Sequence, residues 1–303
     1  MARNLSLPAL NRVLASLDAA RNGRALYALL TAFCFGGLLL ASAESALARG
    51  DNLRGAIWAG LALAAAFFGV NATGLLLMDQ ALGRPVRDVV DAFVDALLGA
   101  HRVLLCLLMV LVPAAGAIAA LLALLYAVRL PWVGPALFGL LVPLGVLMLG
   151  LMSFCTVVLV GPLVGPSIWS GRSARQTVAM LWHQARHGLL EAAALMVIVL
   201  LLSGAVTAAI SFVVISGGRA MALLSVLLLG IDVPAQQLMA GLFGYGLRSL
   251  GASGAPVAAT PLGMAALVGG GVVFALALVL PTLIYLRGCC AVYLALQGED
   301  DIS

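Results

Sequence analysis

Charged residues are scarce in this chain, and lysine is absent. Only 9% of the 303 residues are charged, whereas a soluble domain carries about 25%. All sixteen basic residues are arginines, which excludes chemistry that needs a lysine, such as a P-loop or a Schiff base. The arginines are spread over many short segments, so a net charge of +4 does not form a nucleic-acid-binding surface.

Cysteine is also sparse, and its spacing indicates neither a metal site nor a redox motif. The five cysteines include no CxxC pair, and most fall in apolar runs where they behave as small hydrophobes. They are Cys34, Cys106, Cys155, Cys289 and Cys290. We expect no disulfide or metal chemistry from them.

Long hydrophobic runs fill the rest of the chain. Hydrophobic residues make up 64% of it, and its mean hydropathy is +1.16, so we predict an all-α, polytopic transmembrane helical bundle forming one integral membrane domain over 1–303. Six runs are long enough to cross a bilayer. They cover residues 25–47, 56–78, 103–127, 136–160, 189–215 and 262–286.

The region 216–261 does not fit a simple pair of spans. Its apolar stretch is short and is followed at once by Asp232 and Pro234. We therefore predict a helical or re-entrant segment on the outer side. Eleven of the sixteen arginines fall on the same side as the N-terminus, which predicts that both termini are cytoplasmic.

Two polar stretches interrupt the apolar pattern in a similar way. "GRPVRDVVDAF" begins at Gly83 and "GRSARQTVAML" begins at Gly171, and they share Gly, Arg, Arg and Val at equivalent positions. Each predicts an amphipathic helix, over 84–101 and 172–187, and a third is predicted within 1–24. Each precedes a pair of spans, so we predict three repeated units of an interfacial helix plus a helical hairpin on the inner surface.

The polar faces of the two later helices carry different charges. Two interpretations stay open: both helices only anchor the topology, or they contact lipid or a partner protein. Anionic lipid would attract the basic face and repel the acidic one, and the two faces could also pair with each other. The candidate contact residues are Arg84, Arg87, Asp88, Asp91 and Asp95 in the first helix, and Arg172, Arg175, His183, Arg186 and His187 in the second.

The arrangement resembles the YciC-like group of bacterial inner-membrane proteins and the membrane domain that precedes some glycerophosphodiester phosphodiesterases. The resemblance rests on the threefold plan and on "GRPVRDVVDAFVDAL" and "GRSARQTVAMLWHQARHGLLEA". It implies a six-span protein of the bacterial inner membrane without established chemistry. No stretch resembles the phosphodiesterase catalytic domain, so that activity is not expected.

Two clusters could carry chemistry, but a structural interpretation is preferred for each. His183, His187 and Glu191 have the spacing of metal ligands on one helical face, although Gly188 interrupts that helix. The three aspartates of the first polar helix lack the glycine and arginine of the known alcohol phosphotransferase motif, and we interpret them as a solvated face. We expect no catalytic residue, cofactor or metal.

The sequence thus favours a non-catalytic inner-membrane subunit or scaffold that supports an envelope or membrane complex. A permease, or a protein that handles lipids or hydrophobic solutes, is the alternative, and an intramembrane enzyme is the third. The expected partners are the lipid bilayer and a membrane protein, with no nucleic acid. The sequence predicts no oligomeric state.

Overall fold

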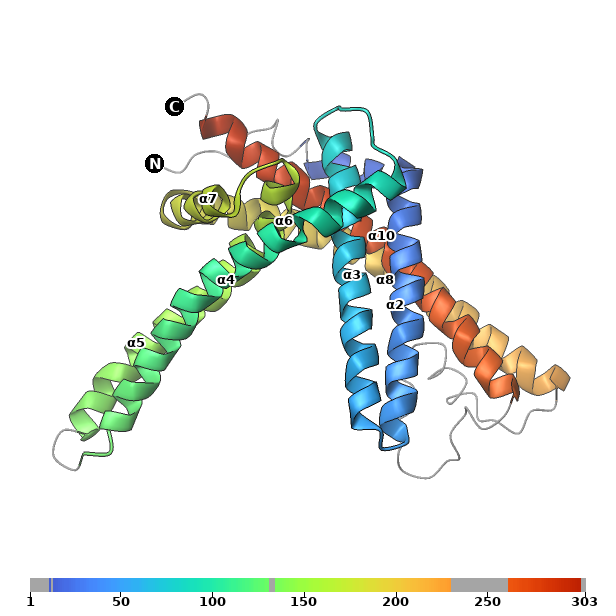
Figure 1. Cartoon of the computed structure of the whole chain (residues 1–303), viewed down its shortest axis with the longest axis horizontal. Helices are drawn as coiled ribbons and strands as arrows, with labels where there is room; N and C mark the ends of the chain where they lie inside the picture. Colours follow the sequence, from blue (N-terminus) through green and yellow to red (C-terminus); the bar gives the residue numbers. More distant parts are fainter. Residues whose placement is uncertain (1–10, 12, 131–133, 230–260, 301–303) are drawn as a thin grey trace. The chain divides into compact units, whose positions relative to one another are not determined.

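The chain is built from helices, as the sequence predicts (Figure 1). The computed structural model describes residues 11, 13–130, 134–229 and 261–300, and these contain no strand. The elements are η1 (Ala15–Arg21), α2 (Gly23–Ala48), α3 (Asn52–Ala81), α4 (Val89–Ala127), α5 (Gly134–Cys155), η2 (Thr156–Val160), α6 (Gly161–Trp169), α7 (Ala174–His187), α8 (Leu189–Leu229) and α10 (Pro261–Asp300).

Within these described residues, six helical stretches are long and apolar enough to cross a membrane. They are Gly23–Leu47, Asn52–Ala81, Val89–Ala127, Gly134–Trp169, Leu189–Ser225 and Ala275–Gln297. The chain is therefore a multi-pass membrane protein. It divides into two compact units: unit 1 contains residues 1–14, 97–198 and 288–303, and unit 2 contains 15–96 and 199–287.

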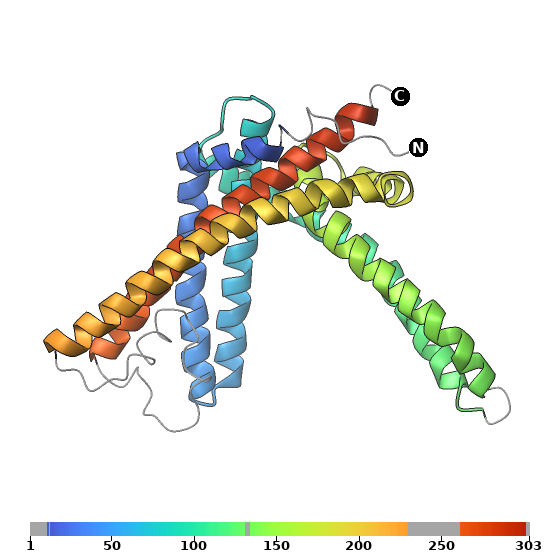
Figure 2. The same cartoon turned by 180° about the vertical axis from the view of Figure 1, so that it is seen from behind.

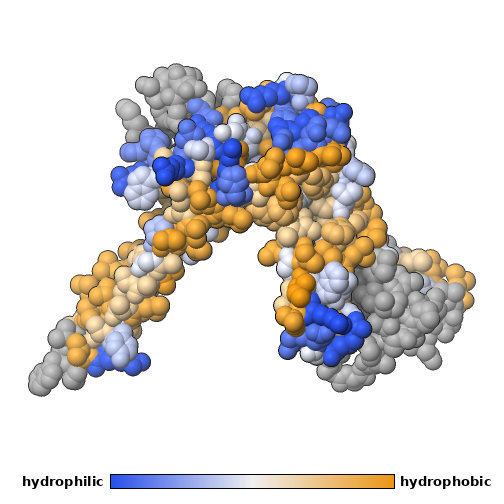
Figure 3. All heavy atoms as spheres, in the orientation of Figure 1, coloured by the Kyte–Doolittle hydropathy of each residue, from blue (hydrophilic) through white to orange (hydrophobic). Residues whose placement is uncertain are grey.

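In unit 2, α2 and α3 form a close antiparallel hairpin, which both views show (Figure 2). Gly50, with φ 80°, follows α2, and the Asp51 side chain caps α3 by accepting from the Arg54 N–H at 3.2 Å. A Cβ built on Gly69 would lie 2.1 Å from the Cβ of Ala32. The absence of a side chain at Gly69 therefore lets the two helices approach. Hydrophobic surface covers the middle of this hairpin, with hydrophilic surface at its ends (Figure 3).

The first predicted surface helix differs from the structure. We predicted a helix over 84–101 followed by a separate span from residue 103, but α4 is continuous from Val89 to Ala127, and residues 84–88 are not helical. Pro85 disfavours helical geometry at the preceding residue, Arg84. No glycine or proline separates His101 and Arg102 from the apolar run that follows, so these polar residues lie inside one long helix.

In unit 1, the fourth span is an interrupted helix. The α-helix α5 is followed directly by the π-helix η2. The helix α6 comes next, with Pro162 near its start and Pro166 inside it. The Thr156 hydroxyl donates to the Met152 carbonyl at 2.8 Å, one turn back. The predicted span 136–160 is therefore extended by α6 to Trp169.

The helix predicted over 172–187 is present as α7. It ends at Gly188, whose N–H donates to the Gln184 carbonyl at 2.9 Å. The buried side of α7 consists of Ala174, Thr177, Leu181 and Gln184. Two of these four buried residues are polar, so the buried side of α7 is not purely apolar.

The last two long helices also depart from the predicted boundaries. The helix α8 runs to Leu229 rather than ending at 215, and 230–260, most of the predicted outer segment 216–261, lies outside the described residues. The predicted span 262–286 ends too early, since α10 continues to Asp300 and its candidate span is Ala275–Gln297. We placed the boundary at Arg287, but that arginine lies inside the helix, and residues 288–296 beyond it are mostly buried.

The predicted N-terminal helix over 1–24 is described only in part. Residues 1–10 and 12 lie outside the described residues, whereas η1 is a short 3₁₀ helix that leads into α2. Asn22 caps α2 by accepting from the Ala25 N–H at 3.1 Å. The three units predicted from the sequence therefore remain a prediction.

Candidate functional site

The first polar stretch begins with a glycine turn that ends α3. Gly83 has φ 66°, which favours glycine because the left-handed region carries no Cβ penalty for it. Its N–H donates to the Gln80 carbonyl at 3.2 Å, and the Arg84 N–H donates to the Asp79 carbonyl at 2.9 Å. This pair of bonds is a Schellman motif, and it directs the chain into the segment that carries the charges.

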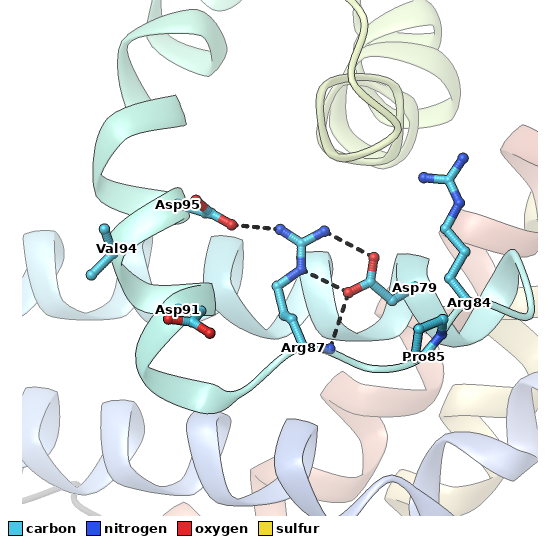
Figure 4. A pocket seen from close by; sticks show the side chains of 7 residues that line it. All are labelled: Asp79, Arg84, Pro85, Arg87, Asp91, Val94 and Asp95. Atoms are coloured by element: carbon cyan, nitrogen blue, oxygen red, sulfur yellow. Dashed lines mark hydrogen bonds and ion pairs between the residues drawn. The ribbon is translucent and has the colours of Figure 1, made fainter.

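Arg87 holds this segment through two carboxylates. Its Nε and Nη2 donate to Oδ2 and Oδ1 of Asp79 at 2.7 and 2.9 Å, and its Nη1 donates to Oδ2 of Asp95 at 2.7 Å (Figure 4). The exposed fractions of these side chains are 7% for Asp79, 29% for Arg87 and 49% for Asp95. We call these three residues the Arg87 clamp. The fork of a guanidinium matches a carboxylate in this bidentate geometry, so the clamp ties the end of α3 to the first turns of α4.

The clamp also changes the acid–base properties of its arginine. The hydrogen bond that Arg87 donates to Asp79 raises the pKa of Arg87, and burial opposes this shift without reversing it. Arg87 therefore stays charged wherever the protein is folded, and it serves to fix the segment rather than to exchange protons.

A second arginine stabilises the backbone of the same segment. Arg24, at the start of α2, donates through Nη1 to the carbonyls of Val86 and Arg87, the latter at 3.1 Å. Close by, the Asn22 amide donates to the Gln80 side-chain oxygen at 3.1 Å, and the Gln80 amide donates to the Asp18 carbonyl at 3.3 Å. The non-helical residues 84–88 are therefore fixed in two ways: through the Arg87 side chain, and through the backbone carbonyls that accept from Arg24.

An open pocket of about 540 Å³ lies over the clamp. It is lined by Asp79, Arg84, Pro85, Arg87, Asp91, Val94 and Asp95. The structure thus brings together four of the five predicted residues of the first set, and the fifth, Asp88, is exposed beside them. In the part of the chain that the structure describes, Asp88 and Asp91 have no ion-pair partner. Arg84 extends away from the clamp (Figure 4).

The second polar stretch repeats the glycine turn of the first. Gly171 has φ 103°; its N–H donates to the Ile168 carbonyl at 3.0 Å, and the Arg172 N–H donates to the Ser167 carbonyl at 3.3 Å. The same Schellman pattern therefore occurs at the aligned glycine–arginine pairs of the two stretches. After it, Ser173 and Gln176 form a capping box that begins α7.

Buried hydroxyl groups join α7 to its neighbours in unit 1. Ser167 and Thr177, both fully buried, are hydrogen-bonded at 2.9 Å. The Ser170 hydroxyl is 2.7 Å from the hydroxyl of Tyr293 in α10. When the amide oxygen of Gln297 faces these groups, it accepts from the Tyr293 hydroxyl at 2.9 Å and from Arg172 at 3.0 and 3.1 Å. Arg172 thus contributes to packing inside unit 1.

The remaining predicted residues of the second set lie on the exposed side of α7. Arg175, His183, Arg186 and His187 are exposed. Arg186 stacks its guanidinium 4.3 Å from the ring centroid of Trp182, and the rings of His183 and His187 are 4.9 Å apart. Glu191 lies in the first turn of α8, beyond the Gly188 cap. Among the described residues, no three His, Cys, Asp or Glu side chains are grouped to hold a metal ion.

The sequence did not identify several residues that organise these sites. Asp79 follows the predicted second span, Arg24 precedes the first, and Tyr293 and Gln297 lie beyond the predicted end of the last. The available signal for Asp79 was a single carboxylate at the very end of an apolar run, eight residues before Arg87. Nothing in the local pattern of Tyr293 indicates its contact with Ser170, because that contact joins residues 123 positions apart.

Comparisons with known proteins give no match: none was found to a protein family, a curated protein or a solved structure. The class of the protein, a multi-pass membrane protein, therefore rests on its helices.

Proposed function

We propose that the protein is a non-catalytic subunit or scaffold of a bacterial inner membrane, and that it docks a partner protein through the acidic segment, defined as residues 84–95. The orientation proposed is the one predicted from arginine bias, with both termini and this segment cytoplasmic. The proposal rests on one observation: the Arg87 clamp pairs two aspartates and leaves two others exposed.

The clamp uses one arginine to hold two aspartates and leaves two others facing outward. Asp79 and Asp95 are engaged with Arg87, whereas Asp88 and Asp91 stay exposed. The Schellman turn and Arg24 fix the backbone beneath them. A fixed carboxylate pair loses little conformational entropy when it binds, and complementary charge sets register and partner choice. A basic segment of a membrane-protein partner fits this surface.

The test is purification in native lipid nanodiscs followed by mass spectrometry of the associated proteins. We expect a stoichiometric partner with the wild-type protein and its loss with D88N/D91N. Asparagine still suits the position before α4 as a helix cap, so the variant removes charge without removing the helix start. The matched control is D88E/D91E, which keeps both charges and should keep the partner.

A permease or lipid-handling function is the second candidate, and the interrupted fourth span favours it. A π-helical turn inside a helix is frequently found at a functional site, and η2 lies between α5 and α6, with the two prolines of α6 after it. A specific lipid or small molecule retained in the nanodiscs without any protein partner would support this candidate against the scaffold.

A further inference from the structure

The helix α7 presents a basic and aromatic face whose direction is fixed by the packing on its other side. Its buried residues Ala174, Thr177, Leu181 and Gln184 recur every three or four positions, and the Ser167–Thr177 bond of 2.9 Å ties this side to α6. Because the buried side is fixed, the opposite side is fixed as well. Arg175, Ala179, Trp182 and Arg186 share it, at spacings of four, three and four residues.

Trp182 is the central residue of this face. Its side chain is 60% exposed, which is unfavourable for an indole in water. Arg186 covers the ring from one side at 4.3 Å, and Arg175 lies two turns away on the same stripe. Tryptophan is enriched at the headgroup level of membranes, where its ring meets apolar surface and its N–H meets water.

The position of α7 in the chain indicates that this helix lies near a membrane surface. The candidate span Gly134–Trp169 ends just before it, and the next candidate span starts at Leu189, directly after its Gly188 cap. A short helix between two span ends cannot move far from the bilayer boundary.

The charge of this stretch has one sign. Residues 170–190 contain three arginines and two histidines and no acidic residue. Arg172 is engaged with Tyr293 and Gln297, which leaves Arg175 and Arg186 at the surface. The acidic segment 84–95 contains three aspartates and two arginines. An excess of basic residues is therefore a feature of α7 and not of both polar stretches.

From these observations we infer that α7 binds the headgroups of anionic phospholipids, with Arg175 and Arg186 on either side of Trp182, whose ring inserts at the headgroup level. Arginine at an anionic leaflet forms charge-assisted hydrogen bonds to phosphate oxygens. This surface differs from the acidic segment, and the inference does not depend on the partner protein proposed above.

The experiment places the full-length protein in nanodiscs of phosphatidylcholine that contain an equal, minor fraction of either brominated phosphatidylglycerol or brominated phosphatidylcholine. Bromine quenches tryptophan at short range. The contribution of Trp182 is the difference in emission between each protein and its W182F counterpart. Quenching curves then give the association constant of phosphatidylglycerol relative to phosphatidylcholine at this residue.

We expect phosphatidylglycerol to be preferred, and the preference to fall about fivefold for each arginine replaced in R175Q and R186Q. R175K/R186K keeps the charges and should keep most of the preference. R102Q/R219Q is the matched control, since it removes the same charge from exposed arginines elsewhere and should change nothing at Trp182.

Three outcomes would overturn the inference. Equal quenching by the two lipids in the wild type would show that α7 does not select anionic headgroups. An equal loss of preference in R102Q/R219Q would assign the effect to the overall charge. Absence of quenching by either lipid, together with a protein cross-linked at position 182, would assign the face to a protein partner.

Discussion

The Asp79 carboxylate differs from the other acidic residues of the site in its surroundings. It is buried, and Arg87 is its bidentate partner. Asp95 binds the same arginine from a half-exposed position. Because both carboxylates bind the same guanidinium, comparing them shows how burial affects the strength of an ion pair.

Replacing Asp79 should destabilise the protein much more than replacing Asp95. D79N removes charge-assisted hydrogen bonds in a shielded position and should lower the free energy of unfolding by about 1.5–3 kcal/mol. D95N breaks a solvent-screened pair and should cost about 0.2–1 kcal/mol. Steric trapping in bicelles measures both values. Equal losses for the two variants would show that burial does not control the strength of the clamp.

The residues of this site that could be recognised from the sequence are those that lie close together along the chain. Arg87 and Asp95 were named as candidate lipid or partner contacts because they belong to one polar stretch, eight residues apart, but their pairing with each other was not predicted. Asp79 was missed because it belongs to the preceding helix, and a periodicity within one helix does not indicate pairing with another. Arg24 was missed for the same reason, since its two carbonyl acceptors lie more than sixty residues away.

Among the helices, the α2–α3 hairpin depends on a close approach that a single methyl group would prevent. Gly69 faces Ala32 at a distance that leaves no room for a side chain. Small residues at such contacts let membrane helices pack their backbones closely. The stability of this hairpin should therefore depend on the combined size of the side chains at positions 32 and 69.

The substitution G69A should destabilise the hairpin by about 1–3 kcal/mol, the usual cost of overpacking. The double variant G69A/A32G moves the methyl group to the other helix and should recover most of the loss. G60A is the matched control in the same helix, since a Cβ there meets nothing within 4 Å, and it should be neutral or stabilising. Thermal unfolding in detergent checks all three, and additive effects at 69 and 32 would rule out the contact.

The helical elements were predictable because runs of about 20 apolar residues leave few alternatives in a membrane. Their ends were less predictable. Arg287 ended a predicted span but lies inside α10, whose following residues are buried by contacts that the local pattern does not indicate. At the start of α4, the predicted helix began at residue 84, whereas residues 84–88 are not helical and are held by the Arg24 and Arg87 contacts until α4 begins at Val89.

For the whole molecule, cysteine labelling tests the predicted orientation. In a cysteine-free background, R49C and R129C should react with a membrane-impermeant thiol reagent in intact cells, because both follow helices that cross outward in the predicted topology. D91C should react only after the cells are permeabilised, which also shows that its thiol is accessible. Labelling of D91C in intact cells would reverse the orientation and move the acidic segment to the outer side.

Unit 1 is assembled from stretches that are far apart in the chain, and this affects how the protein is made. The Ser170 hydroxyl donates to the Ser167 carbonyl and is also hydrogen-bonded to the Tyr293 hydroxyl, yet residues 199–287 must be translated between Ser170 and Tyr293. At translation rates of about 5–20 residues per second, the ribosome takes roughly 4–20 s to cover residues 199–287. During this time, Ser170, which lies between α6 and α7, lacks the Tyr293 hydroxyl that it contacts in the folded protein. We therefore expect a chain that is truncated before residue 288 to leave this surface exposed to quality-control proteases, and the yield of the protein to fall.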